Sequence, residues 1–386
     1  MRELVRRIEG VTPPDRDRAV DALRAFAVLG VVCGHWLVTA LVADSGTVHG
    51  ASPLRHMPGL APVSWVFQTL AVFFLVGGRV AARGYASARA RGESYGYWLA
   101  ARAGRLFRPV VALCAVWSVA AGVMLASGVD EATVRALAKL VWSPLWFLLV
   151  FAALTAATPL VARLHPLWPL AVVLYADLFR LGLDGPAALG WINVAAGWLV
   201  PYCLGAAWAR GALADRRTGW VLLAGGAAAT AGLVLFAGYP AAMVGVPGGT
   251  LSNLDPPTLA AVTFGLAQCG AALLLLGRLR RVLARPAVWA VVALLNLSAM
   301  TVFLWHQTAM IVVTSTALFL YGPLPGLHTA PDGPGWVLAR LAWLPVFTLV
   351  LLLLRSAFGL YEHRRGGHGR AVRSGPPVPT GETHHA

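Results

Sequence analysis

Charged residues are scarce in this chain of 386 residues. Asp, Glu, Lys and Arg make up only 12% of it, about half of their share of about 25% in soluble globular proteins. Hydrophobic residues make up 58%, and they gather in stretches long enough to cross a bilayer. This composition excludes an ordinary soluble enzyme and predicts a polytopic membrane protein whose first partner is the lipid bilayer.

Cysteine is rare too, and signals for metal binding, disulfides or export are missing. The four cysteines fall inside apolar stretches without paired spacing: they are Cys33, Cys114, Cys203 and Cys269. We therefore expect small buried hydrophobic residues and no metal site. Residues 1–18 lack the apolar core and small-residue cleavage site of a signal peptide, which predicts a cytoplasmic N-terminal segment.

Ten apolar stretches are candidate membrane spans. They run over residues 19–42, 62–84, 107–127, 140–162, 167–181, 190–209, 219–238, 257–277, 288–320 and 335–356. In lipid only helices satisfy their own backbone polar groups locally, so we expect an all-α, polytopic transmembrane bundle of about ten spans. No separate soluble domain is expected. The membrane domain is predicted at 19–356, and a disordered, basic cytoplasmic tail at 357–386.

Two of these spans are irregular. The stretch 167–181 is short and contains Asp177, a costly residue in hydrocarbon. The stretch 288–320 is too long for one span, so we expect the helix to end near Thr314 with an external extension.

Positive charge is abundant, with a formal net charge of +15, but it is unevenly distributed. With the N-terminus inside, 25 of the 31 Lys and Arg residues fall in inside segments and five in outside segments. This asymmetry follows the positive-inside rule. We therefore expect both termini to be cytoplasmic, the loops 43–61 and 239–256 to be external, and the protein to lie in the plasma membrane. The charge reports topology, and no nucleic acid partner is expected.

Ionisable residues recur along one face of the first span. At 100° per residue, Asp21, Arg24 and His35 lie on one stripe, with Arg24 and His35 about 16 Å apart along the axis. Such groups are costly in lipid, so the stripe suggests a polar path into the bundle. We expect Asp21 to pair with Arg24. The alternative is an interfacial ion pair together with a histidine that only bonds a neighbouring helix.

Three arginines, Arg102, Arg105 and Arg108, recur every third residue near the cytoplasmic start of the third span. Guanidinium groups bind phosphate oxygens in pairs of hydrogen bonds, so this cluster is a candidate anion site. The alternative is anchoring of the span by positive charge alone.

Further polar residues are expected toward the external side. His306 lies at a depth similar to that of His35, which suggests a water-filled cavity but fits a packing histidine equally well. Asn253 and Asp255 precede the eighth span, where they form either a simple turn or a rim that binds an acceptor.

Five motifs follow one another through the apolar stretches. They are Asp21, Leu23, Arg24, Ala25 and His35; Phe73, Phe74 and Gly77; Arg102, Arg105, Arg108 and Pro109; Leu145 to Leu148; and Trp305 with His306. In this order they resemble the acyltransferase 3 family of integral-membrane enzymes, which O-acylate sugars, polysaccharides and some secondary metabolites. One departure is Val76, which stands where family members commonly have Ser.

The resemblance implies an O-acyltransferase that uses acyl-CoA, with acetyl-CoA as the favoured donor. Arg102, Arg105 and Arg108, together with Arg24, would hold the phosphates of coenzyme A. His35 would act as the general base on a hydroxyl of a glycan, a sugar or a glycosylated metabolite.

The resemblance also implies roles nearer the acceptor. His306 would assist catalysis, and Asn253, Asp255 and Trp305 would contact the acceptor. From the residues alone, a transporter or exporter of a glycan or small metabolite is the alternative. The absence of visibly repeated halves and of paired interrupted helices argues against a transporter.

Overall fold

The structure, a computed structural model, describes residues 2–44 and 47–363. The predicted tail therefore lies outside the described residues from residue 364 onward. The helices are α1 (Arg2–Gly10), α2 (Arg18–Val38), α3 (Pro53–His56), η1 (Pro58–Leu60), α4 (Ala61–Ser64), α5 (Leu70–Ala90), α6 (Tyr95–Ala126), α7 (Glu131–Trp142), α8 (Leu145–Ala156), α9 (Thr158–Val161), α10 (Leu167–Asp177), η2 (Leu178–Gly182), η3 (Ala187–Trp191), α11 (Ile192–Ala209), α12 (Arg216–Phe236), α13 (Leu259–Leu283), α14 (Pro286–Leu297), α15 (Ala299–Tyr321) and α16 (Pro334–His363). The strands are β1 (Ala40–Asp44) and β2 (Thr47–Ala51).

Helices dominate the described residues, which confirms the predicted all-α membrane bundle. Eight helical stretches there are long and apolar enough to cross a membrane. They are Arg18–Val38, Tyr95–Ala126, Glu131–Ala156, Ala187–Ala209, Arg216–Phe236, Leu259–Leu283, Ala299–Tyr321 and Pro334–Gly359. The helices α5 and α10 stand for the other two of the ten predicted spans.

These two helices depart from the predicted spans for different reasons. Helix α5 begins at Leu70 and not at residue 62, because the proline-rich segment before it forms the short helices α3, η1 and α4. Helix α10 has only 11 residues and continues into the single π-helical turn η2. Its neighbour α11 therefore provides more of the membrane-crossing length in this part of the bundle.

The stretch 288–320 is indeed too long for one span, but it consists of two helices, and the predicted end near Thr314 with an external extension is wrong. The break lies at Ser298, between α14 and α15, and α15 continues to Tyr321. The Ser298 hydroxyl donates to the Leu294 carbonyl at 2.9 Å and closes α14. The surplus length thus lies before the span as α14, which packs against α1 and α2.

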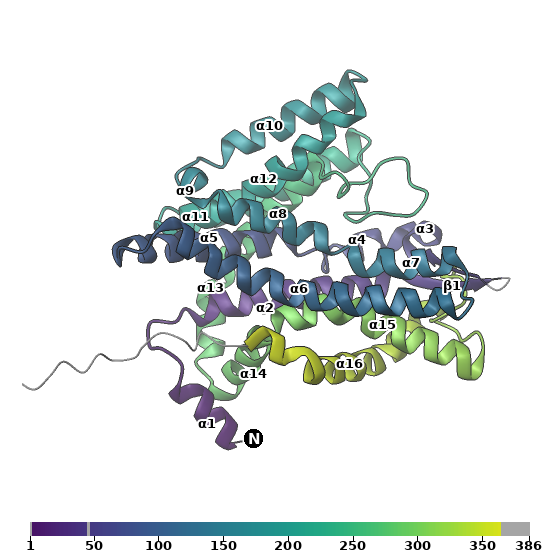
Figure 1. Cartoon of the computed structure of the whole chain (residues 1–386). Helices are drawn as coiled ribbons and strands as arrows, with labels where there is room; N and C mark the ends of the chain where they lie inside the picture. The colour runs from purple at the N-terminus through teal and green to yellow at the C-terminus, as the bar shows by residue number, and fades with distance from the viewer. Residues whose placement is uncertain (1, 45–46, 364–386) are drawn as a thin grey trace, which may run out of the picture.

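Figure 1 shows the two ends of the bundle. Helices α1 and α14 and the C-terminal end of α16 lie at one end, and the hairpin of β1 and β2 lies at the opposite end. The two strands pair antiparallel, from Ala40 opposite Ala51 to Asp44 opposite Thr47. Strand β2 lies within the loop predicted at 43–61, but β1 begins at Ala40, inside the predicted span 19–42, because α2 ends at Val38.

Helix α15 lies deepest in the bundle, since 72% of its apolar window is buried, against 17% for α6, α12 and α16. Helices α5 and α11 make close backbone contact with each other. A Cβ at Gly78 would collide with the Tyr202 carbonyl, and one at Gly205 with the Leu75 carbonyl. Small residues of this kind let membrane helices approach closely. The glycine that ends the predicted FF-x-x-G motif, Gly77, faces the ring of Phe151 instead.

Candidate active site

Two cavities lie one after the other along the bundle. The first, of about 560 Å³, is lined by Arg24 of α2 and by Arg102 and Arg105 of α6, and we name it the arginine cavity. The second, of about 770 Å³, is lined by His35 of α2 and Gln307 of α15, and we name it the histidine cavity. Helices α2, α5, α8 and α15 contribute residues to both, so the cavities share the same central helices.

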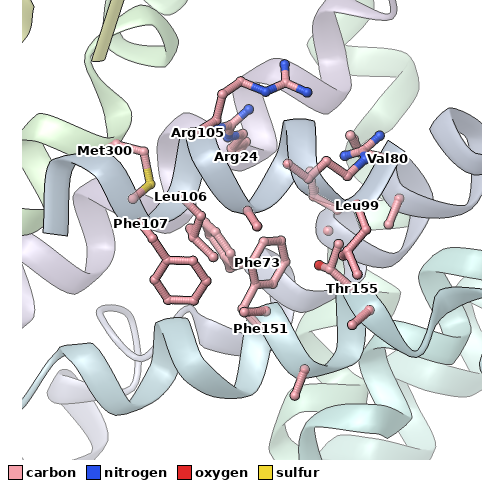
Figure 2. A pocket seen from close by; sticks show the side chains of 18 residues that line it. Arg24, Phe73, Val80, Leu99, Arg105, Leu106, Phe107, Phe151, Thr155 and Met300 are labelled. Carbon is pink, nitrogen blue, oxygen red and sulfur yellow. The ribbon is translucent and has the colours of Figure 1, made fainter. Parts of the chain in front are cut away.

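The arginine cavity combines cationic groups with apolar walls. Figure 2 shows the guanidinium groups of Arg24 and Arg105 on one side, and the rings of Phe73 and Phe151 on the other. Arg24 lies six residues after the start of α2, which follows α1, so this cavity belongs to the α1 end of the bundle. Such a site suits a ligand with an anionic end and a long arm of low charge.

Two of the three predicted arginines of α6 reach this cavity, and the third does not. The Arg102 guanidinium lies over the Trp98 ring, 4.7 Å from its centroid, and its Nε has no hydrogen-bond partner among the described residues. Arg108 is exposed and does not line the cavity. Six residues correspond to about 240° around a helix, so Arg108 points away from Arg102. The spacing by threes spreads the arginines around α6 and does not align them.

The histidine cavity is lined by several uncharged polar groups, one carboxylate and tryptophans. Its polar or titratable lining residues are His35, Thr39, Ser64, Gln68, Ser143, Asp255 and Gln307, and its tryptophans are Trp142, Trp146 and Trp191. His35 lies three residues before the end of α2, on the hairpin side. The loop between α12 and α13 adds Val244 and Asp255 to the lining, so the loop predicted at 239–256 borders this cavity.

His35, His306 and Gln307 meet in a close cluster at this cavity. Nε2 of His306 lies 3.2 Å from Nδ1 of His35, and Nε2 of Gln307 lies 2.7 Å from the same nitrogen. The two imidazole rings meet edge to face with their centroids 5.0 Å apart. His306 is fully buried and does not line the cavity, whereas His35 does. The two histidines touch each other, so they lie at the same depth in the bundle, as predicted.

The hydrogen bonds around His306 fix where its proton lies. Its Nδ1 is 2.6 Å from the Phe303 carbonyl, which can only accept, so Nδ1 carries the proton and donates. Nε2 of neutral His306 is therefore a lone pair that faces His35. Both of these contacts of His35 are made at Nδ1, so the protein holds that edge of the ring. His35 also lines the histidine cavity, where a ligand could reach its ring.

Comparison with known proteins agrees with this geometry. A model of the acyltransferase 3 family, described as an acyltransferase domain, matches residues 17–356. This range contains every residue that lines either cavity. The chain belongs to the acyltransferase 3 family. Searches among curated proteins and among solved structures found no match.

In this membrane acyltransferase, a buried arginine that the motifs did not include supports the histidine cluster. Arg340 of α16 is 1% exposed, and it donates to the carbonyls of Trp36, Thr39 and Gly326 at 2.6, 2.6 and 3.0 Å. The Trp36 indole in turn donates to the His306 carbonyl at 2.9 Å. A signal was present in the sequence, since Arg340 lies on the predicted outer side against the positive-inside rule.

Three other predicted residues of the acyltransferase lie elsewhere. Asn253 is buried and bonds Pro240, Ala242 and Thr258 within its own loop. Trp305 is 2% exposed and stacks on Phe358 at 3.9 Å, on a side that lines neither cavity. Asp21 forms an ion pair with Arg16 at 2.7 Å instead of the expected pair with Arg24. Of the two predicted outer-loop residues, Asn253 and Asp255, only Asp255 lines the histidine cavity.

Asp177, the unexpected charge in the short predicted span, has a structural explanation. Its carboxylate accepts from Asn193 at 2.9 Å, from Tyr239 at 3.1 Å and from the backbone N–H of Leu259 at 2.6 Å. Arg180 lies 3.4 Å from it. Burial, together with the neighbouring carboxylate, raises the pKa of Tyr239 above its usual range. The cluster ties α10 to α11 and α13 and lines neither cavity.

Proposed function

We propose that this acyltransferase is an O-acyltransferase that binds acyl-CoA in the arginine cavity and acylates a hydroxyl group in the histidine cavity. Acetyl-CoA is the favoured donor, and a glycan, sugar or glycosylated metabolite is the acceptor. The protein lies in the plasma membrane with both described ends on the cytoplasmic side. The donor then enters from the cytoplasm and the acceptor from the opposite side.

Charge supports the assignment of the donor. Arg24, Arg102 and Arg105 gather at the arginine cavity, and guanidinium groups bind phosphate oxygens with short, charge-assisted hydrogen bonds. The free Nε of Arg102 is a buried donor that lacks a partner and suits an anionic ligand. The apolar walls at Phe73 and Phe151 suit the uncharged pantetheine arm. The adenine nucleotide would remain at the mouth, since the cavity has a volume of only about 560 Å³.

The lining of the histidine cavity supports a hydroxylated acceptor. Gln68, Ser143 and Asp255 provide hydrogen bonds to hydroxyl groups, and Trp142 and Trp191 provide flat apolar faces. A sugar ring has both an apolar face and a rim of hydroxyl groups. The volume of about 770 Å³ lies within the usual range of about 300–1,000 Å³ for small-molecule sites.

The cluster around His35 carries the proposed mechanism. A lone pair on Nδ1 of His35 would face the lone pair of His306, which disfavours that tautomer. The Gln307 amide can turn by 180° at no steric cost, and its Oε1, buried without a partner, then accepts from His35. In this arrangement Nδ1–H of His35 donates to both neighbours. Nε2 is left as the basic lone pair of the ring.

The reaction then balances around Nε2 of His35. The nitrogen takes the proton of the acceptor hydroxyl as the oxygen attacks the thioester carbonyl. The carbonyl re-forms, the carbon–sulfur bond breaks, and the coenzyme A thiolate takes the proton from the imidazolium. His306 and Gln307 stabilise the imidazolium through Nδ1–H. The products are an ester and free coenzyme A, and His35 returns to its neutral form.

Thiol release tests this proposal. The purified acyltransferase is mixed with acetyl-CoA and a panel of sugars and glycan fragments, and free thiol and acetyl ester are measured together. His35→Gln, which cannot accept a proton at neutral pH, should lower transfer by about 10²-fold or more. His56→Gln changes an exposed histidine of α3 and should leave transfer unchanged. Equal amounts of thiol and ester support the proposal. Absence of both across the panel, or at least a tenth of wild-type transfer in His35→Gln, contradicts it.

A further inference from the structure

A layer of aromatic rings separates the two cavities. Phe73 and Phe151 line the arginine cavity, whereas Phe147 and Phe303 line the histidine cavity. None of the described residues lines both cavities. The Phe73 ring meets that of Phe147 edge to face at 4.9 Å, and the Phe147 ring lies 5.5 Å from that of Phe303. Rings from three helices, α5, α8 and α15, therefore touch in series between the cavities.

The layer is backed on one side by further aromatic packing. Phe74, which is fully buried, contacts Phe147 at 5.2 Å and stacks on Trp198 at 5.1 Å. Phe151 packs against Phe73 at 5.1 Å, and a Cβ at Gly77 would collide with its ring. Aromatic rings in such contacts exclude water and present no hydrogen-bonding group. The closed layer is thus an apolar seal between two cavities that both carry polar groups.

The positions of the arginines and of His35 make this layer part of the reaction path. Arg24 and His35 lie about 16 Å apart along α2, on either side of the layer. If the phosphates of the donor stay at the arginines, the thioester has to cross the layer to reach His35. An unbranched pantetheine arm is slim enough to pass between rings that turn aside. A long acyl group ahead of the sulfur has to fit through the same gap.

We propose that Phe73, Phe147 and Phe303 form a seal that sets the length of the acyl group and keeps water from the thioester. This inference rests on the proposed function, because it assumes a donor in the arginine cavity. The rings act as specificity-determining residues and take no part in the proton transfer. A smaller side chain in the layer joins the two cavities into one passage.

Acyl-chain preference is the first test. In Phe73→Ala and Phe303→Ala, the ratio of kcat/KM for octanoyl-CoA to that for acetyl-CoA should rise at least tenfold. Thiol release without an acceptor should also rise severalfold, because water reaches the thioester. Phe303→Leu and Phe73→Leu keep more of the packing. They should therefore raise the kcat/KM ratio and the thiol release without an acceptor by smaller factors than the alanine variants. Phe319→Ala, an 88% exposed position on the same helix as Phe303, is the matched control and should change neither. An unchanged ratio in variants that transfer acetyl overturns the inference.

A second test does not depend on transfer. In a chain whose four cysteines are replaced by alanine, Ala103→Cys places a thiol in the arginine cavity. A membrane-impermeant thiol reagent added to intact cells should not label it while the layer is intact. When Phe73→Ala or Phe303→Ala is introduced into the same chain, the reagent should label the thiol from outside. Labelling with the layer intact, or none in either variant, overturns the seal. Failure of the proposed function can be told apart from failure of the seal. If the proposed function is wrong, the wild-type protein transfers no acyl group, whether or not the thiol is labelled.

Discussion

The two cavities differ in the kind of polar group that they contain. The arginine cavity has permanently charged guanidinium groups on an apolar wall, whereas the histidine cavity has imidazole, amide and hydroxyl groups and one carboxylate beside tryptophans. Fixed charge holds an anionic ligand but moves no proton at neutral pH. A neutral imidazole can take and return a proton. The difference suggests that binding of the donor and chemistry on the acceptor occur in separate places along the same helices.

The supporting contacts differ in the same way. His35 is held by a chain of hydrogen bonds that leads through His306 and Trp36 to Arg340 on α16. Arg105 of the other cavity is exposed, with one bond to its own helix at the Ala101 carbonyl. Precise placement is needed for proton transfer, and a looser arrangement suffices to attract phosphate groups. Changes at the histidine cavity should therefore alter turnover, and changes at the arginine cavity should alter donor affinity.

Among the residues that support His35, the largest effect should come from His306. His306→Leu removes one of the two acceptors for His35 Nδ1–H, so we expect kcat to fall about 100-fold with little change in the KM for acetyl-CoA. His306→Gln, which still offers a side-chain acceptor, should recover about tenfold. Steady-state kinetics in which the concentrations of both substrates are varied measure kcat and the KM for acetyl-CoA separately. A rise in donor KM without a fall in kcat would break the division between the cavities.

Arg340 should affect both stability and turnover. Arg340→Met leaves the Trp36 and Thr39 carbonyls without donors, so we expect a loss of about 3 kcal/mol in the free energy of unfolding and a fall in kcat of about twentyfold. Arg278→Met, at an exposed position of α13, is the matched control and should change neither. Thermal unfolding in detergent together with kinetics measures both. An unaltered Tm would argue that the Arg340 bonds add nothing to the placement of His35.

Donor affinity should separate the arginines of α6. Arg102→Gln and Arg105→Gln each remove a charge from the cavity, so we expect the KM for acetyl-CoA to rise about tenfold. Arg108→Gln removes the same charge from an exposed face and should raise it less than twofold. At high salt, the difference in the KM for acetyl-CoA between these variants and the wild type should become smaller, since salt screens exposed charges. Equal effects of all three substitutions would indicate that the arginines only anchor the span by their positive charge.

The smallest effect should distinguish the two outer-loop residues. Asp255 lines the histidine cavity, so Asp255→Asn should raise the acceptor KM about threefold and leave the Tm unchanged. Asn253→Ala removes three bonds within the loop and should lower the Tm and leave the acceptor KM nearly unchanged. Titration of the acceptor and thermal unfolding separate the two results. The reverse pattern would make Asn253 the contact with the acceptor.

Part of this site could be predicted from local sequence, because the relevant residues share one helix. The stripe of Arg24 and His35 follows from the helical repeat, and each residue lines a cavity, although an aromatic layer separates the two cavities. The same reasoning failed for Arg108, because residues six apart do not share a helix face. It also gave Asp21 the wrong partner, since Arg16 lies in the non-helical segment before α2, whose direction no periodicity determines.

Contacts between distant segments could not be predicted. His306 lies 271 residues from His35, and Arg340 lies 304 residues from Trp36. Hydropathy places such residues at similar depths but does not say which helices are neighbours. Span boundaries were wrong where composition is uniform: the apolar stretch 288–320 gives little sign of the break at Ser298. The aromatic layer was likewise hidden, because phenylalanines in a membrane helix have no distinctive pattern.

Transfer across the membrane tests the separation of the two cavities most directly. Inside-out and right-side-out vesicles from cells that produce the acyltransferase carry their own acceptor and receive labelled acetyl-CoA from outside. We predict acetyl ester in the lumen of inside-out vesicles, where the arginine cavity faces the donor, and none in right-side-out vesicles. The His35→Gln protein should give none in either. Equal labelling in both orientations, or ester formed on the same side as the donor, would contradict the account.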